Sequence, residues 1–321
     1  MSETEKKKKR KKRTRKKEKP PYLLLGSGVF VLLVCVYMFL SPISVVNKFL
    51  FNPSKVTAYP DIPGELLGAK REDVNFQTPF GVNLNGIYFE KPGAKYVAIL
   101  HHGQDGNIGE HMGLVKTILM NGQSVLTYDY EGFGISSGSP SIAGIIEDGQ
   151  SAVDFLVRTK KFKPNQIIQY GASMGSGVAA QVALTKGAAA VILIAPYTSL
   201  KKLAKETYPY LNLYPDFFFP ADVGVYEFFT KNLVVPVLCI HGEDDQRISV
   251  SHTKLLEQTF GKRVTSYVIV PGKHHSDLGV EFLAKEIGIF LKDSLGVTDT
   301  YGDKSEIENK ETEKEAVPAL P

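Results

Sequence analysis

The sequence predicts an α/β fold in which helices cover both faces of a mostly parallel sheet. From residue 96 to residue 295, short apolar runs typical of buried strands alternate with longer stretches typical of helices, which is the pattern of repeated βαβ units. One of these runs, Ile167–Tyr170, passes directly into a helix-like stretch through the pentapeptide Gly-Ala-Ser-Met-Gly. A chain of 321 residues that is 43% hydrophobic can also bury the core that such a fold requires.

The first 20 residues are predicted to form a basic cytoplasmic tail. They contain 12 Lys or Arg and three Glu, a net charge of +9, whereas the whole chain has a net charge of +4. The remainder is therefore acidic, and nucleic-acid binding by the folded part is not indicated. The tail is expected to be a solvated, disordered segment, and the alternative is that it touches anionic lipid on the cytoplasmic leaflet.

A transmembrane anchor is predicted at residues 21–40. The 19 residues Tyr22–Leu40 are uncharged and mostly large and apolar, close to the ~20 residues that a helix needs to span a bilayer. A signal peptide is the alternative, but the run is longer than the usual core of roughly 7–15 residues and no Ala-x-Ala site follows it. The basic tail favours a single-pass protein with a cytoplasmic N-terminus and the C-terminal domain on the extracytoplasmic side.

Residues 41–70 are predicted to be a juxtamembrane connector, residues 71–297 the folded domain, and residues 298–321 a disordered acidic tail. The domain is expected to open with a hairpin, in which Val74–Gln77 and Val82–Phe89 flank a Thr-Pro-Phe-Gly turn. Further strands are expected at Tyr96–Leu100, Ser124–Tyr128, Ile167–Tyr170, Ala190–Ile194, Val237–Ile240 and Ser266–Val270, and helices at Glu110–Met120, Ile142–Thr159, after Ser173, and at Ser249–Phe260 and Val280–Leu295.

The alternation of strands and helices breaks once, between Pro196 and Val235. This stretch holds ten aromatic residues, and a long connection at the carboxyl end of a strand is where a lid or binding loop usually lies. We therefore predict a short aromatic-rich cap at about 197–234. Most of its rings are expected to pack the insert onto the domain, and a minority to line the substrate site.

The motif Gly-x-Ser-x-Gly between a strand and a helix describes a nucleophile elbow, a sharp turn that holds the serine hydroxyl out at the top of the sheet. Gly171 and Gly175 fit such a turn, because a side chain at either position would collide with neighbouring backbone. A second match, Gly134–Gly138, follows a polar loop and lacks the strand–turn–helix frame. Ser173, rather than Ser136, is therefore the candidate nucleophile.

A serine hydroxyl needs a neighbouring base, and hydrolases built on an elbow carry the acid and the histidine later in the chain. Here an acidic loop follows the predicted strand at 237–240, and a loop with two histidines follows the strand at 266–270. Both loops leave the sheet at the edge that carries Ser173. On the residues alone, the candidates for the acid are Asp244 and Asp245, with Glu243 and Asp277 nearby, and the candidates for the base are His274 and His275.

Backbone N–H groups must stabilise the oxyanion that forms when serine attacks a carbonyl. One donor is expected from Met174, directly after the nucleophile, and the second from Gln104, in the loop after the strand at 96–100. His101 and His102 are expected to shape that loop rather than to bind a metal. The sequence contains no CxxC or HExxH motif, and neither a metal nor a cofactor is predicted.

Six stretches in this order carry a family resemblance: His102–Asn107, Asp129–Gly138, Gly171–Gly175, Ala195–Ser199, His241–Ile248 and Gly272–Asp277. They resemble the motifs HGNAGN, DYRGYGxSxG, GxSxG, Ala-Pro-Phe-Thr-Ser, HGxxDxxV and GxGHxD of the Bem46-like group of membrane-anchored abhydrolase-domain proteins. Related bacterial serine hydrolases are labelled serine aminopeptidase-like. The resemblance extends from about Val74 to Leu291.

The resemblance implies an α/β-hydrolase fold, with a mostly parallel sheet of about eight strands, helices on both faces and a short cap, here preceded by one transmembrane helix. It places the catalytic acid at Asp245 and the catalytic histidine at His275. The departures that matter for the site are Glu131 for Arg, Gln104-Asp105 for Asn-Ala, and His274 for Gly. The first two change the polarity beside the mouth of the site, and the third crowds the histidine loop without removing a catalytic group.

These features predict a serine hydrolase that cleaves an acyl ester or thioester, or a peptide or amide bond, through an acyl-enzyme. Relatives of the group include depalmitoylases, lipases and peptidases. The predicted anchor and cap favour an acylated small molecule, a lipid or a lipidated protein as substrate. Two alternatives remain: a catalytically silent scaffold that binds a partner at the membrane, and acyl transfer to an acceptor other than water. The oligomeric state is not indicated.

Overall fold

The computed structural model describes residues 28–33, 36–37, 42–231, 234–261, 265–298 and 300–301. The predicted basic tail at 1–20 and most of the predicted acidic tail at 298–321 lie outside the described residues. Of the predicted anchor at 21–40, residues 28–33 and 36–37 are described and are helical. Among the helices of the described residues, none has the length and apolar character needed to cross a membrane.

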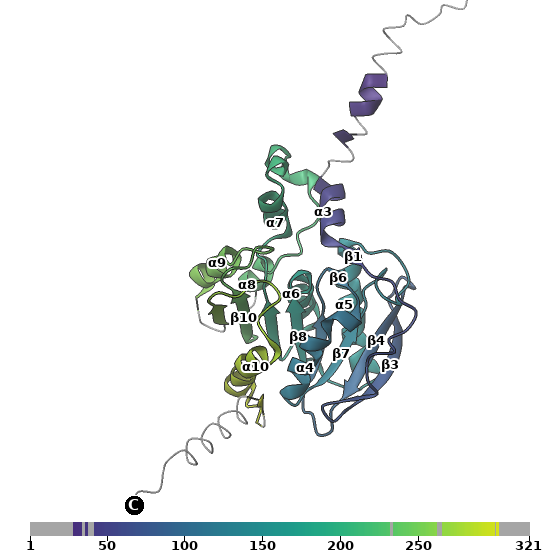
Figure 1. The fold of residues 1–321 in the computed structure, drawn as a ribbon, viewed down its shortest axis with the longest axis vertical. Coiled ribbons are helices and arrows are strands. Elements are labelled where there is room, and N and C mark those ends of the chain that lie inside the picture. The colour runs from purple at the N-terminus through teal and green to yellow at the C-terminus, as the bar shows by residue number, and fades with distance from the viewer. Residues whose placement is uncertain are drawn as a thin grey trace, which may run out of the picture.

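The domain is built on a sheet that has nine strands within the described residues, in the order β11-β10-β9-β8-β5-β7-β4-β3-β2 (Figure 1). The strands from β11 to β7 are parallel, and β4, β3 and β2 continue the sheet antiparallel. The mostly parallel sheet predicted from the sequence is therefore confirmed. The strands are β2 (Glu65–Leu66), β3 (Ala69–Gln77), β4 (Asn83–Glu90), β5 (Val97–His101), β7 (Ser124–Tyr128), β8 (Ile167–Ala172), β9 (Ala190–Ile194), β10 (Val237–Gly242) and β11 (Thr265–Val270).

Helices cover both faces of this sheet. Helices α5 (Ile142–Arg158) and α6 (Met174–Lys186) pack on one face, and α4 (Met112–Met120) and α10 (Val280–Leu295) on the other. Helix α9 (Ser251–Phe260) lies beside β10. Strands β5, β7 and β9 are buried along their whole length, because helices cover them from both sides, and this explains their continuous apolar runs.

The predicted elements mostly match the observed ones, including the hairpin formed by β3 and β4. The single helix expected at Glu110–Met120 is wrong, because that stretch contains two helices. A 3-10 helix, η1 (Ile108–His111), begins earlier, where the side chain of Asn107 accepts a hydrogen bond from the Gly109 N–H, and α4 follows it. A short 3-10 helix, η2 (Pro164–Gln166), precedes β8.

The segment predicted as a connector is folded against the domain. It contains α3 (Pro42–Leu50) and the short strand β1 (Asn52–Pro53). Strand β1 pairs in parallel with β6 (Asp105–Gly106), which belongs to the loop after β5. The side chains of Leu50 and Tyr59 are buried. Residues 41–70 therefore reach the loop in which the second oxyanion donor was predicted.

The cap consists of four short helices between β9 and β10, and α3 lies beside it in Figure 1. Its rings do not mostly pack onto the domain as predicted, and of the ten only Tyr197 lines a cavity beside Ser173. Tyr197, Phe228 and Phe229 are buried against the domain, whereas Phe217 is 80% exposed. The helices of the cap are α7 (Leu200–Thr207), η3 (Pro209–Leu213), η4 (Asp216–Phe218) and α8 (Tyr226–Lys231).

Candidate active site

Ser173 lies on a strained turn between β8 and α6, with φ 54° and ψ −121°. A positive φ is unfavourable for a residue with a side chain and costs about 1–3 kcal/mol, so the surrounding structure must enforce it. The two glycines of the motif allow this crowding. A Cβ at Gly175 would lie 1.9 Å from the carbonyl oxygen of His101, and a Cβ at Gly171 would lie 2.3 Å from the carbonyl oxygen of Gly175.

The structure brings together the three side chains that were predicted to act on the substrate. The Oγ of Ser173 lies 3.0 Å from the Nε2 of His275, and the Nδ1 of His275 lies 2.7 Å from the Oδ2 of Asp245. Asp245 follows β10, His275 follows β11 and Ser173 follows β8, so all three groups extend from the carboxyl ends of parallel strands. The serine hydroxyl therefore has a base within hydrogen-bond reach, and that base is oriented by a carboxylate.

Asp245 is held in place by further contacts to both of its carboxylate oxygens. Its Oδ1 accepts hydrogen bonds from the backbone N–H groups of Arg247 and Ile248, at 2.8 Å and 2.9 Å. The Nε2 of the buried His241 lies 3.3 Å from its Oδ2. Burial alone would raise the pKa of Asp245, but the hydrogen bonds from His241, His275 and Ile248 together hold that pKa well below its usual range. Asp245 is thus an anion at neutral pH.

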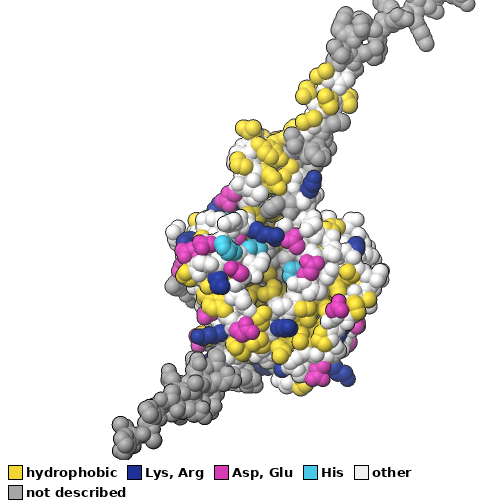
Figure 2. Space-filling view, in the orientation of Figure 1, with side chains coloured by type: hydrophobic (Ala, Val, Ile, Leu, Met, Phe, Trp, Pro, Cys, Tyr) yellow, Lys and Arg dark blue, Asp and Glu magenta, His cyan; other side chains and the backbone are white. Residues whose placement is uncertain are grey.

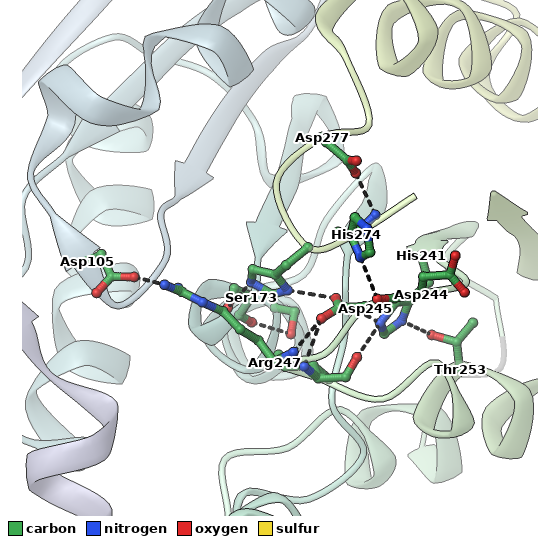
Figure 3. Close-up of polar contacts among 12 residues, drawn as sticks. Asp105, Ser173, His241, Asp244, Asp245, Arg247, Thr253, His274 and Asp277 are labelled. Carbon is green, nitrogen blue, oxygen red and sulfur yellow. Dashed lines mark hydrogen bonds and ion pairs between the residues drawn. The ribbon is translucent and has the colours of Figure 1, made fainter. Parts of the chain in front are cut away.

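The neighbouring candidates take part in the folding of the two loops. The carbonyl oxygen of Asp244 lies 2.8 Å from the Nδ1 of His274, and the N–H of His274 donates to the Oδ1 of Asp277 at 2.6 Å (Figure 3). Glu243 lies 3.6 Å from the ammonium of Lys254 at the surface. His274, which departs from the family pattern, therefore links the acid loop to the histidine loop.

The two predicted oxyanion donors lie beside Ser173. Within the part of the chain that the structure describes, neither the N–H of Gln104 nor that of Met174 donates to a protein acceptor. The loop runs directly beside the serine, since a Cβ at Gly103 would lie 3.7 Å from the Cβ of Ser173, an ordinary contact distance. The carbonyl oxygen of Gln104 accepts a hydrogen bond from the N–H of Asn52 at 3.0 Å, so β1 fixes the loop from the outside.

Comparison with known proteins shows the family to which the chain belongs. Residues 92–218 match the family model described as serine aminopeptidase, S33. The uncharacterised protein Rv2307c of Mycobacterium tuberculosis is 30% identical over 214 residues, which cover 64% of this chain and 72% of that protein. The chain belongs to the α/β-hydrolase superfamily. A further relative of this α/β hydrolase, the uncharacterised protein YfhR of Escherichia coli K12, is 28% identical over 256 residues, covering 77% of this chain and 85% of YfhR.

Solved structures share the fold of this α/β hydrolase. The esterase Pf2001 of Pyrococcus furiosus superposes with a TM-score of 0.61 at 22% identity, covering 76% of this chain and 98% of the esterase. An α/β serine hydrolase homologue from Coxiella burnetii superposes with a TM-score of 0.51 at 18% identity, covering 69% and 96% of the two chains. At these identities the likeness concerns the fold alone.

Two cavities flank Ser173 in this α/β hydrolase. The first, of about 390 Å³, extends past His275 towards α4 and α10, and the second, of about 550 Å³, extends under the cap. Apolar side chains that line the first are Leu114, Ile194, Leu278, Val280 and Leu283. Those that line the second are Leu50, Met174, Tyr197, Leu203 and Ile248, with Glu206 and Gln246 as polar neighbours. A substrate can thus extend from the serine in two directions.

Arg247, which had no predicted role, lies between these cavities and lines both. Its guanidinium donates to the Oδ2 of Asp105 at 2.6 Å (Figure 3). This ion pair links the loop after β10, the acid loop, to the loop after β5 that contains Gln104, which we call the oxyanion loop. The side chain of Asn52 donates to the other carboxylate oxygen at 2.9 Å. Burial would raise the pKa of Asp105, but these two hydrogen bonds lower it below its usual value. The only indication of Arg247 in the sequence was its position in the stretch His241–Ile248, which also contains the predicted acid.

Replacing Arg247 with Ala should lower kcat by roughly tenfold and change KM little, because small displacements of an oxyanion loop weaken catalysis more than binding. The free energy of unfolding should fall by no more than about 1 kcal/mol, since the ion pair is exposed. Arg247→Lys should restore part of the rate. A matched control is Glu72→Gln, which removes the remote surface pair with Lys160 at 2.5 Å. An unchanged kcat in Arg247→Ala would show that this ion pair positions nothing.

The remaining residues that the sequence singled out have structural roles. His101 lies 2.8 Å from the hydroxyl of Tyr128 and 2.7 Å from the Oε1 of Gln169, and burial lowers its pKa to about 4. The Nδ1 of His102 lies 2.7 Å from the carbonyl oxygen of Gly103. No group of three or more potential metal ligands occurs among the described residues. Both histidines therefore help to shape the oxyanion loop.

Proposed function

We propose that this chain is a membrane-anchored serine hydrolase that cleaves an acyl ester or thioester through an acyl-enzyme. The observation that carries the proposal is the continuous hydrogen-bonded path from the Oγ of Ser173 through His275 to Asp245. It agrees with the strained serine turn, which holds the hydroxyl beside both cavities. Amide and peptide bonds are a second class that the same groups can attack.

The proposed mechanism begins with attack of the Ser173 oxygen on the acyl carbonyl, while its proton passes to the Nε2 of His275. The anion of Asp245 holds the imidazole in the required tautomer and stabilises the imidazolium. The N–H groups of Gln104 and Met174 stabilise the oxyanion. His275 then returns the proton to the leaving oxygen or sulfur, and water releases the acyl group by the same steps in reverse. No cofactor takes part in this mechanism.

The substrate we propose has an apolar acyl part and a second arm, as in an acylated small molecule, a lipid or a lipidated protein. The support is the shape of the site, since the serine lies between two cavities with mostly apolar walls. The apolar stretch at residues 22–40 and the basic run before it support a chain anchored by its N-terminus, with the hydrolase domain on the extracytoplasmic side.

Labelling with two fluorophosphonate probes tests the chemistry and the orientation together. In cells that express the full chain, a permeant probe should form an adduct, which peptide mapping should place on Ser173 rather than on Ser136. A charged, impermeant probe should label intact cells equally well, because the domain faces outward. Labelling by the permeant probe alone would reverse the orientation. The absence of any adduct on the folded protein would favour a silent scaffold instead.

Once labelling is established, a substrate panel narrows the reaction. p-Nitrophenyl esters, acyl thioesters and aminoacyl amides should be compared with and without an added alcohol acceptor. We expect the protein to hydrolyse esters or thioesters, with the free carboxylic acid as the product. A transacylase would instead give the ester of the added alcohol as its main product.

A further inference from the structure

The cap ends in an apolar surface whose outermost side chains are exposed. We call it the cap tip and define it by five residues of η3, η4 and the turn between them: Tyr210, Leu213, Tyr214, Phe217 and Phe218. The side chains of Leu213 and Phe217 are 84% and 80% exposed. Apolar side chains gather over this end of the molecule in Figure 2. Large apolar side chains clustered at this exposure mark a contact surface.

The charge around the cap tip suits an interface between water and lipid. The sequence from Pro209 to Pro220 contains one acidic residue, Asp216, and no basic one. Its two carboxylate oxygens lie 2.6 Å and 2.9 Å from the ammonium groups of Lys201 and Lys205. The one carboxylate is therefore neutralised by two lysines on α7, which leaves a surplus positive charge at the base of an aromatic surface. Aromatic rings next to lysines are typical of membrane interfaces.

Tyr37, one of the described residues of the apolar N-terminal stretch, lies against the same surface. The ring of Tyr37 lies 5.7 Å from that of Tyr214 and 5.8 Å from that of Phe218, between centroids. Residues 28–33 continue away from the domain at this end (Figure 1), and the side chains of Val29 to Leu33 are 51–67% exposed. The cap tip therefore adjoins Tyr37, a described residue of the stretch proposed as the anchor.

We propose that the cap tip lies in the interfacial zone of the same bilayer that holds the N-terminal segment. This inference rests on the proposed membrane anchoring and is independent of the proposed chemistry. The bilayer is favoured as the occupant because the adjoining stretch, Tyr22–Leu40, carries no charge, and because the basic run before it would be attracted to anionic headgroups on the opposite leaflet. The Lys201 and Lys205 ammonium groups would then face the headgroups of the near leaflet.

This placement also gives a route for the substrate. Helices α3 and α7 connect the cap tip to the serine, and each contributes an apolar wall residue, Leu50 and Leu203, to the cavity under the cap. The cavity therefore has an apolar wall on the side of α3 and α7, where an acyl chain from the bilayer would enter. The ligand class assigned to the cap tip is a glycerophospholipid surface, and the class assigned to the cavity is an acyl chain delivered from it.

The chain contains no Trp, so a single introduced Trp reports on its own surroundings. Phe217→Trp in the full chain, bound to vesicles of phosphatidylcholine and phosphatidylserine, should show blue-shifted emission that brominated lipids quench. The control is Ile289→Trp, at a 38% exposed position on α10, which lies at the opposite end of the molecule (Figure 1). Its emission should be that of a surface Trp and should resist lipid quenching.

The outcomes separate the proposals. If the chain floats with vesicles but brominated lipids quench Phe217→Trp no more than Ile289→Trp, the cap tip is not in the bilayer, and the anchoring stands. If the emission of Phe217→Trp shifts without lipid in proportion to protein concentration, a second copy covers the tip and the inference is wrong. If the chain does not float with vesicles, anchoring and inference fail together, while adduct formation at Ser173 still decides the chemistry. Leu213→Trp serves as a second reporter if Phe217→Trp does not fold.

A functional test uses Leu213→Asp combined with Phe217→Asp. This variant should lower kcat/KM for a long-chain ester embedded in vesicles by tenfold or more, because charges are excluded from the interface. Hydrolysis of a short water-soluble ester should be unchanged, since neither residue lines a cavity at the serine. Ile289→Asp should affect neither substrate. An equal loss on both substrates would assign the cap tip to folding of the cap and overturn the inference.

Discussion

Replacing Ser173 with Ala should lower kcat for ester hydrolysis by about 10⁵-fold or more, while KM changes little. Removal of a nucleophilic serine costs roughly this much because the acyl-enzyme route is lost, and the residual rate comes from the oxyanion donors and from binding. Both cavities remain intact, because the alanine only lacks the oxygen that lies 3.0 Å from His275. Steady-state kinetics on purified full chain, with active sites counted by fluorophosphonate titration of the wild type, measure the effect.

The second Gly-x-Ser-x-Gly sequence provides the matched control. Ser136 is buried, and its hydroxyl donates to the carbonyl oxygen of Asp129 at 2.7 Å and accepts from the N–H of Asn85 at 2.9 Å. Ser136→Ala should therefore cost about 1–3 kcal/mol in the free energy of unfolding and leave kcat near the wild-type value. If Ser136→Ala abolished turnover in folded protein while Ser173→Ala did not, the assignment of the nucleophile would be wrong.

Asp245→Asn should lower kcat by about 10⁴-fold with the fold retained, because an amide in place of the carboxylate favours the wrong tautomer of the catalytic histidine. In the present structure the carboxylate faces the Nδ1 of His275 at 2.7 Å, and an amide N–H at that position would require Nδ1 to be the acceptor. Nε2 would then carry the proton and could not accept one from Ser173. Single-turnover kinetics would show slow acylation with substrate binding unchanged.

The same variant should alter the dependence of stability on pH. The folded-state pKa of Asp245 lies below its usual value, so its ionisation stabilises the fold above pH of about 4 and this stabilisation is lost as the pH falls further. The difference in unfolding free energy between wild type and Asp245→Asn should therefore be larger at neutral pH than in acid. The side chain of Asp244 is exposed. Asp244→Asn should therefore leave kcat at the wild-type value, and its unfolding free energy should depend on pH as that of the wild type does. Equal losses of rate in both variants would contradict the proposed role.

The parts of the fold that follow from local sequence could be predicted. The strand–turn–helix frame around Ser173 identified the elbow, because a buried apolar run before it and small residues after it have a direct structural meaning. The order of the acid and histidine loops followed from the strands that precede them. The choice of Asp245 over Asp244 could not be made from local chemistry, since both follow the same strand, and it required the family resemblance.

The contacts that could not be predicted join residues far apart in the chain. Asp105 meets Asn52 across 53 positions and Arg247 across 142 positions, and no periodicity in the sequence indicates such pairs. Residues 41–70 were interpreted as a juxtamembrane connector because they contain Pro and Gly and follow the predicted anchor. Their folding depends on burial of single side chains such as Leu50 against the domain, which is a tertiary effect.

The pairing of β1 with β6 affects how this protein can be prepared for study. A shortened chain that begins after residue 54 would lack the apolar N-terminus and be easier to purify, but it would also lose Asn52, whose N–H and side chain hold Gln104 and Asp105. It would lose Leu50 from the wall of the cavity under the cap as well. Weak turnover by such a protein would reflect a loosened oxyanion loop rather than the chemistry of Ser173. A truncated form meant for enzymology should therefore retain the chain from Pro42 onward.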